Sequence, residues 1–148
     1  MSRHWLRLIA LGSAATLFLA PAWAGAADSQ KSFGSPAEAV AAFVAAAKAH
    51  DTKALLGILG PGAKGLVNSG DPVADRNGRE TFVKAYEESN ELDMQGDAKA
   101  ILSIGKDAWT LPIPIVKVGS AWRFDDKQGA EEILNRRIGR NELSAIQA

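Results

Sequence analysis

The spacing of the apolar residues changes near Glu91, and this change constrains the fold more than any other feature of the sequence. Before it, apolar residues recur at the i, i+3, i+4, i+7 spacing of an amphipathic helix. These residues are Val40, Phe43, Val44 and Ala47. After it, apolar and polar residues alternate, as in a strand with one buried face. The alternating apolar residues include Ala100, Leu102 and Ile104. Helices followed by strands predict an α+β domain.

Capping signals set the expected helix boundaries. Ser35 and Glu38 form a capping box around Pro36, which predicts a helix beginning there. Asp51 is the expected N-cap of a second helix, which stops at Gly60 and Pro61. A third helix is expected to begin at Asn77, where Glu80 completes a similar box. Its apolar face would consist of Phe82, Val83, Ala85 and Tyr86.

Turn residues divide the second half into strands. Turns are expected at residues 96–97 and 105–107, and a Gly-first II′ hairpin at residues 118–121. The longest predicted strand places four apolar side chains on one face. They are Trp109, Leu111, Ile113 and Ile115. Pro112 and Pro114 remove donors from one side of this strand, which predicts an edge strand or the rim of an opening.

A terminal helix is expected after Asp126, with Gly139 as a possible break. Its arginines would point outward, as a solvated face or as a docking surface. They are Arg136, Arg137 and Arg140. The whole predicts helices packed on a curved four-stranded antiparallel sheet, with a C-terminal helix, in a single α+β domain at 35–148.

Residues 1–24 have the three parts of a secretory signal peptide. Arg3 and Arg7 make a basic start, residues 8–20 are almost continuously apolar, and small residues follow, with cleavage after Ala24 or Ala26. The apolar run is shorter than the roughly 20 residues of a membrane-spanning helix, which disfavours a retained anchor. We therefore expect a periplasmic or secreted protein, with a flexible tether at 25–34 and no membrane span after cleavage.

Composition excludes several classes of function. The chain has no cysteine, which removes disulfides, thiol nucleophiles and Cys-ligated zinc. Loss of residues 1–24 removes two arginines and no acids, which leaves a formal charge of −2. A mildly acidic domain lacks the positive field that attracts nucleic acid.

Three local patterns fail as cofactor or metal motifs. Residues 60–65 match G-x-G-x-x-G by letter, but they follow a helix instead of a strand. A calcium loop aligned on Gly78 would place Val73 and Lys84 where carboxylates are required. His50 ends the first helix, where a cation is favourable, and no second histidine lies in the mature domain. No cofactor and no metal are expected.

The polar segment at 68–76 and the helix after it supply a candidate carboxylate–guanidinium site. Its residues are Asp71, Asp75, Arg76, Arg79 and Tyr86. The alternative is structural, with Asp71 capping a turn at Pro72 and Asp75 paired to a nearby arginine. Large aromatic residues on the sheet are candidates for lining a pocket or for the core. They are Trp109, Trp122 and Phe124.

Taken together, several segments resemble the DUF2950 family of exported bacterial proteins. They are Phe33 to Pro36 with Glu38 to Val40, Asp51-Thr52 before Leu55-Leu56, residues 69–76, Trp109 with residues 112–114, residues 122–125 and residues 136–143. The resemblance covers nearly the whole mature chain and implies no reaction, substrate or catalytic residue. Members of this family continue into a glycine- and aromatic-rich second half, so the chain looks like an N-terminal part or a shortened member. The architecture is also similar to NTF2-like and cystatin-type folds, an analogy at the level of the fold alone.

These observations favour a non-catalytic exported module that binds a small apolar ligand or a partner protein. The alternative is a small pocket hydrolase or isomerase that uses Asp71 or Asp75 as base and Arg79 or Tyr86 as electrophile. This alternative requires the four side chains to converge in one cavity. A third possibility is a structural part of a longer protein, indicated by exposed apolar surface at residues 143–148.

Overall fold

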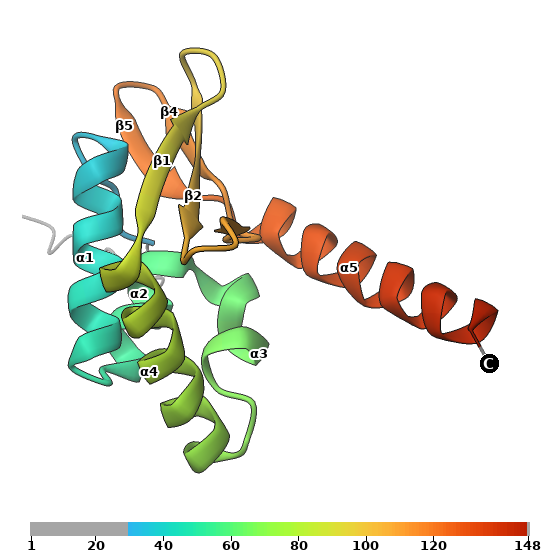
Figure 1. Ribbon diagram of the computed structural model, residues 1–148. Helices are drawn as coiled ribbons and strands as arrows, with labels where there is room; N and C mark the ends of the chain where they lie inside the picture. The colour runs from blue at the N-terminus through green and yellow to red at the C-terminus, as the bar shows by residue number, and fades with distance from the viewer. Residues whose placement is uncertain (1–29, 148) are drawn as a thin grey trace, which may run out of the picture.

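The computed structural model describes residues 30–147, in which α-helices precede and follow an antiparallel sheet (Figure 1). The helices are α1 (Pro36–Lys48), α2 (Thr52–Leu59), α3 (Lys64–Val67), α4 (Pro72–Glu88) and α5 (Asp126–Ile146), with a 3-10 turn η1 (Pro61–Ala63). The strands are β1 (Asn90–Met94), β2 (Lys99–Ile104), β3 (Trp109–Thr110), β4 (Ile115–Val118) and β5 (Ala121–Phe124). This confirms the α+β class. The predicted signal peptide and residues 25–29 of the predicted tether lie outside the described residues.

Residues 30–34 of the predicted tether are hydrogen-bonded to the folded body. The side-chain amide of Gln30 donates to the carbonyls of Ile58 and Leu59, both at 3.1 Å. Phe33 forms a β-bridge with Trp122, with its N–H donating to the Trp122 carbonyl at 2.7 Å. This stretch therefore ties the end of α2 to β5.

The first two helices begin as predicted. The Ser35 hydroxyl accepts the Glu38 N–H at 3.2 Å, and Asp51 Oδ1 accepts the Ala54 N–H at 2.9 Å. The Glu38 carboxylate reaches one residue further back than a capping box requires, to the Gly34 N–H at 2.9 Å. Between the helices, His50 has a left-handed φ of 51° at a position where glycine is usual.

The prediction that the third long helix begins at Asn77 is wrong. Helix α4 begins at Pro72, because Asp71 Oδ1 accepts the N–H groups of Val73 and Ala74, each at 3.0 Å. Pro72 occupies the first helical position, where its missing N–H has no cost. The structural alternative for Asp71, a cap ahead of Pro72, is therefore correct.

The sheet has five strands because the longest predicted strand is broken. β3 and β4 both pair with β2, and the order along the sheet is β1-β2-β4-β5. Ser103 pairs with Thr110 but Ala100 pairs with Ile115, so the register shifts by two residues across the break. Pro112 and Pro114 lie in this break and have no N–H to continue the ladder. The expectation of an edge strand fits β3, which pairs with β2 alone, but not β4, which lies between β2 and β5.

The hairpins and strand faces follow the sequence pattern. β4 and β5 join through Gly119, which has a φ of 64°, and Val118 pairs with Ala121 as expected. In β5, Trp122 and Phe124 are buried and Arg123 is exposed. In β2 every second residue is buried, namely Ala100, Leu102 and Ile104.

One hydrophobic core joins the helices to the sheet. The Phe43 ring of α1 packs against Phe82 of α4 and Phe124 of β5, with ring centroids at 4.9 and 5.5 Å. Phe124, Leu102 and Ile115 are almost completely buried. Aromatic packing of this kind adds stability beyond the area it buries.

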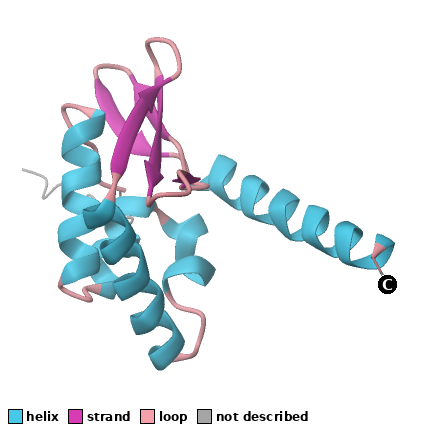
Figure 2. Ribbon diagram, in the orientation of Figure 1, coloured by secondary structure: helices cyan, strands magenta, loops and turns pink. Residues whose placement is uncertain are grey.

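Helix α5 projects away from the other helices and the sheet, and its C-terminal end lies far from them (Figure 2). It continues without a break through Gly139 to Ile146. Its first turns pack closely, because a Cβ on Gly129 would lie 2.6 Å from Ile113 Cγ1. Further along, large apolar side chains are exposed. They are Leu134, Ile138, Leu143 and Ile146, with 46% to 82% of their surface exposed.

Two glycines of α5 predict opposite effects of the same substitution. Gly129→Ala places a methyl group against the Ile113 side chain and backbone and is expected to destabilise the fold by about 1–3 kcal/mol. Gly139→Ala meets no atom within 4 Å and is expected to stabilise the helix by about 0.8–1 kcal/mol. Urea unfolding followed by circular dichroism measures both. Equal effects of the two substitutions would contradict the close packing of α5 on Ile113.

Candidate functional site

An apolar pocket of about 220 Å³ lies among α1, α2, α3 and α4. We call it the helical pocket. Its lining residues are Phe43, Ala47, Leu55, Leu59, Leu66, Val67, Ala74, Asp75, Gly78, Arg79, Phe82 and Leu111. Only Leu111 comes from outside the helices, from the break between β3 and β4. Only two of the twelve lining residues are charged, so the pocket is an apolar surface with one polar edge.

Arg79 is held at this edge by two hydrogen bonds. Its Nη2 donates to the Thr52 hydroxyl at 3.0 Å and to the Val67 carbonyl at 2.9 Å. Both partners precede α4 in the chain, and Val67 also lines the pocket. The guanidinium therefore joins α4 to α2 and to the end of α3 beside the apolar surface.

Asp75 lies one helical turn before Arg79 and binds a different partner. Its carboxylate accepts the Ser69 N–H at 3.1 Å and the Ser69 hydroxyl at 2.7 Å. The Ser69 hydroxyl and N–H lower the pKa of Asp75, and the charge of Arg79 lowers it further. The expected arginine partner of Asp75 is thus replaced by a serine.

The other candidate residues lie away from this pocket. Asp71 caps α4, and Arg76 Nε pairs with Glu80 Oε1 at 3.1 Å. Tyr86 is half-buried and stacks on Phe82 at 6.4 Å between ring centroids. Of the proposed catalytic four, only Asp75 and Arg79 line the helical pocket.

The two tryptophans have different environments. Trp122 is 8% exposed and belongs to the core. Trp109 is 49% exposed and carries the Arg136 guanidinium 5.8 Å from its ring centroid. Neither of them lines the helical pocket.

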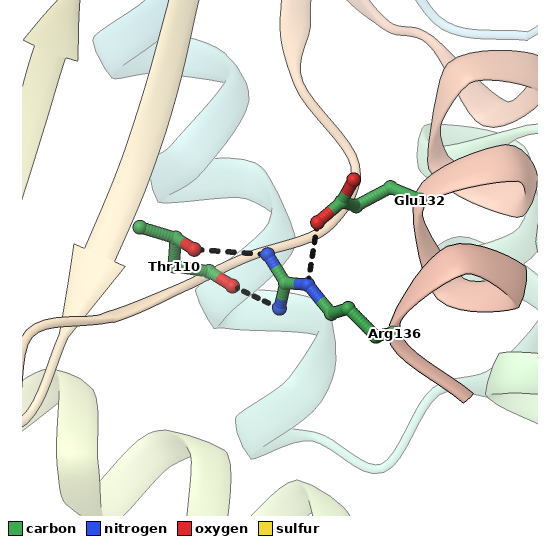
Figure 3. A network of polar contacts seen from close by, with 3 residues as sticks. All are labelled: Thr110, Glu132 and Arg136. Atoms are coloured by element: carbon green, nitrogen blue, oxygen red, sulfur yellow. Dashed lines mark hydrogen bonds and ion pairs between the residues drawn. The ribbon is translucent and has the colours of Figure 1, made fainter. Parts of the chain in front are cut away.

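Arg136 connects α5 to the sheet (Figure 3). Its Nη1 and Nη2 donate to the carbonyl and the hydroxyl of Thr110, both at 2.9 Å, and its Nε donates to Glu132 Oε1 at 2.7 Å. The expectation that Arg136 points outward is therefore wrong, because its guanidinium reaches from α5 to Thr110 of β3. Arg137 and Arg140 are exposed as expected.

A second cleft, of about 350 Å³, lies between α5 and the broken strand. It is lined in part by Pro112, Pro114 and Arg136, with Lys99 across from them on β2. Pro112 and Pro114 therefore lie at the rim of an opening, which was the second of the two alternatives predicted for them. Charges of both signs line this cleft, since Glu131 and Glu132 also contribute.

Sequence reasoning identified Asp75 and Arg79 but not their partners. Ser69 belongs to the polar segment already selected, and its spacing to Asp75 is a usable local signal. Thr110 is separated from Arg136 by 26 residues, and nothing local connects them. The apolar lining was assigned to the core, because a pocket wall and a core have the same periodicity.

Within residues 30–147, no three His, Asp or Glu side chains are grouped as a metal would require. None of the helices in this range combines the length and the apolar character needed to cross a membrane.

The lowered pKa of Asp75 predicts a pH-dependent contribution to stability. The ionised carboxylate binds Ser69 more strongly than the protonated one, so its contribution is present above the ordinary value of 3.8 and is lost as pH falls through the lowered pKa. The stability difference between wild type and Asp75→Asn should therefore be largest near neutral pH and shrink below pH 3.8. Urea midpoints across pH measure it. In a Ser69→Ala background the pH dependence of this stability difference should weaken. An unchanged pH dependence would contradict the assignment of Ser69 as the main cause of the lowered pKa of Asp75.

The Thr110 contacts predict that Arg136 holds the first half of α5 on the body. Arg136→Ala should accelerate amide hydrogen exchange at residues 126–136 by about tenfold, the equivalent of roughly 1.4 kcal/mol. Arg137→Ala is the matched control, since that side chain is exposed. Equal exchange rates in the two variants would show that Arg136 does not anchor the helix.

Comparison with known proteins adds one finding about the family. No curated protein and no solved structure matches the chain. The similarity to NTF2-like folds therefore stays a prediction. The family model described as "Protein of unknown function (DUF2950)" matches residues 30–148, so the chain belongs to the DUF2950 family.

Proposed function

We propose that the chain is an exported, non-catalytic binding domain that takes a small apolar ligand in the helical pocket. The observation that carries this proposal is the pocket lining, in which ten of twelve residues are apolar side chains or glycine. Small-molecule sites in proteins are typically apolar concave surfaces with a few placed polar groups. Asp75 and Arg79 are the polar groups here.

The size of the pocket limits the ligand. An apolar cavity of about 150 Å³ accommodates benzene. A volume of about 220 Å³ therefore suits a single ring or a short branched chain with a small substituent. Longer chains would extend past Leu66, which is half exposed at the pocket.

Export rests on the sequence. The basic start, apolar run and small residues of residues 1–24 are typical of a signal peptide, which supports a periplasmic or secreted location. Whole-cell fractionation tests this part by itself, and a cytoplasmic full-length product would contradict it.

Binding is favoured over catalysis because the proposed catalytic residues have other roles. Asp71 is engaged in capping α4, and Tyr86 does not line the helical pocket. A hydrolase or isomerase would have to use Asp75 and Arg79 alone. Asp75 already accepts the N–H and the hydroxyl of Ser69, and its lowered pKa makes it a weak general base.

A second candidate function is protein binding through α5. The observation that favours it is the exposure of Leu134, Ile138 and Leu143 on a helix that projects from the body. Exposed apolar patches of this kind mark interaction sites. The exposed Leu143 and Ile146 also fit the third possibility, packing against further protein.

A filled pocket predicts lost binding. Gly78 lines the pocket, and a Cβ built on it meets no atom within 4 Å, so we expect the larger side chain of Gly78→Leu to fill part of the pocket. Toluene is the probe, and Gly78→Leu should weaken its binding at least tenfold (about 1.4 kcal/mol) by calorimetric titration. Gly139→Leu, on α5, is the matched control and should bind toluene as wild type does. Absence of toluene binding to wild type, or equal binding to Gly78→Leu, would refute the proposal.

A further inference from the structure

We propose that the natural ligand of the helical pocket carries a carboxylate and an amino group on one apolar side chain, the chemistry of an apolar α-amino acid. This inference rests on the proposed function and specifies its ligand class. It follows from the two charged residues that share the polar edge of the pocket.

Asp75 and Arg79 stand one turn apart on the same face of α4, and both line the pocket. Side chains at this spacing lie about 5–6 Å apart at Cβ, close enough to form a direct ion pair. Each instead binds other groups, Asp75 the Ser69 N–H and hydroxyl and Arg79 the Thr52 hydroxyl and Val67 carbonyl. These contacts hold the two charges at fixed places beside the apolar lining.

Both groups retain capacity for a ligand. Within residues 30–147 the hydrogen bonds of Arg79 use Nη2 alone, so Nε and Nη1 remain as donors. From the described part of the chain, Asp75 Oδ2 accepts only the longer contact from the Ser69 N–H, at 3.2 Å, whereas Oδ1 accepts two bonds. A carboxylate oxygen has room for more than one donor.

A ligand of one charge would meet repulsion at this edge. A simple carboxylic acid bound to Arg79 faces the ionised Asp75, and a simple amine bound to Asp75 faces Arg79. A zwitterion presents its carboxylate to Arg79 and its ammonium group to Asp75. Its two charged groups are attached to one carbon, which suits two protein charges on adjacent helical turns.

The remaining lining selects the side chain. Phe43, Leu55 and Phe82 offer aromatic and aliphatic surface. Within about 220 Å³, a branched aliphatic side chain such as that of leucine fits the volume and buries apolar area. A charged side chain would lose its hydration among these residues without gaining a partner.

Three molecules with the same carbon branch test the head group. L-leucine carries both charges, 4-methylpentanoate lacks the amino group, and 3-methylbutylamine lacks the carboxylate. Calorimetric titration of the mature chain should show leucine binding at least tenfold more tightly than either analogue. Comparable affinity for all three would overturn the inference, while toluene binding blocked by Gly78→Leu would still support the proposed function.

Variants assign each charge to its partner. Asp75→Asn should remove the advantage of leucine over 4-methylpentanoate, and Arg79→Gln should remove its advantage over 3-methylbutylamine. Arg79→Lys keeps the charge and should retain part of the latter preference, which separates charge recognition from the contacts of Arg79 with Thr52 and Val67. Preferences that persist in both neutral variants would contradict the assignment, and binding of neither toluene nor leucine to wild type would also refute the proposed function.

Discussion

The packing of Phe43 between Phe82 and Phe124 is the contact on which the rest of the structure depends. It joins α1 to α4 and to the sheet in a chain without cysteine, where apolar burial supplies the main cohesion. Phe43 and Phe82 also line the helical pocket. The same aromatic contact that holds the layers together therefore forms one wall of the candidate site. The polar edge depends on α4 starting at Pro72, because only then does Asp75 lie in the same helix as Arg79.

Local signals predicted most elements of the fold because those elements are determined locally. Ser35 and Asp51 cap their helices as expected, and alternation in β2 buries every second residue. Gly119 turns the last hairpin at the expected place. The start of α4 was misplaced because two capping patterns compete, and Asp71 with Pro72 prevails over Asn77 with Glu80. The predicted long strand failed because period-two spacing cannot reveal a register shift of two residues at Pro112 and Pro114.

The site was predicted only in part, for a different physical reason. Asp75 and Arg79 are four residues apart in the sequence, so their proximity follows directly from a helix that begins at Pro72, ahead of both residues. The apolar walls come from four helices and one loop, and only tertiary packing brings them together. The hydrogen bonds from Arg136 to Thr110 likewise join α5 to β3, which are far apart in the sequence. The sequence around an arginine on an amphipathic helix is the same whether its side chain faces solvent or a carbonyl. The role of Arg136 can therefore be read only from the folded structure.

The central claim is that the helical pocket, and not the exposed face of α5, receives a small apolar molecule. Methyl-labelled NMR spectra of residues 25–148 titrated with toluene test it most directly, because both surfaces carry methyl groups. The account predicts that the methyl signals of Leu55, Leu59 and Val67 shift with one dissociation constant. It also predicts that those of Leu134, Ile138 and Leu143 stay in place. Shifts confined to the three residues of α5 would contradict it.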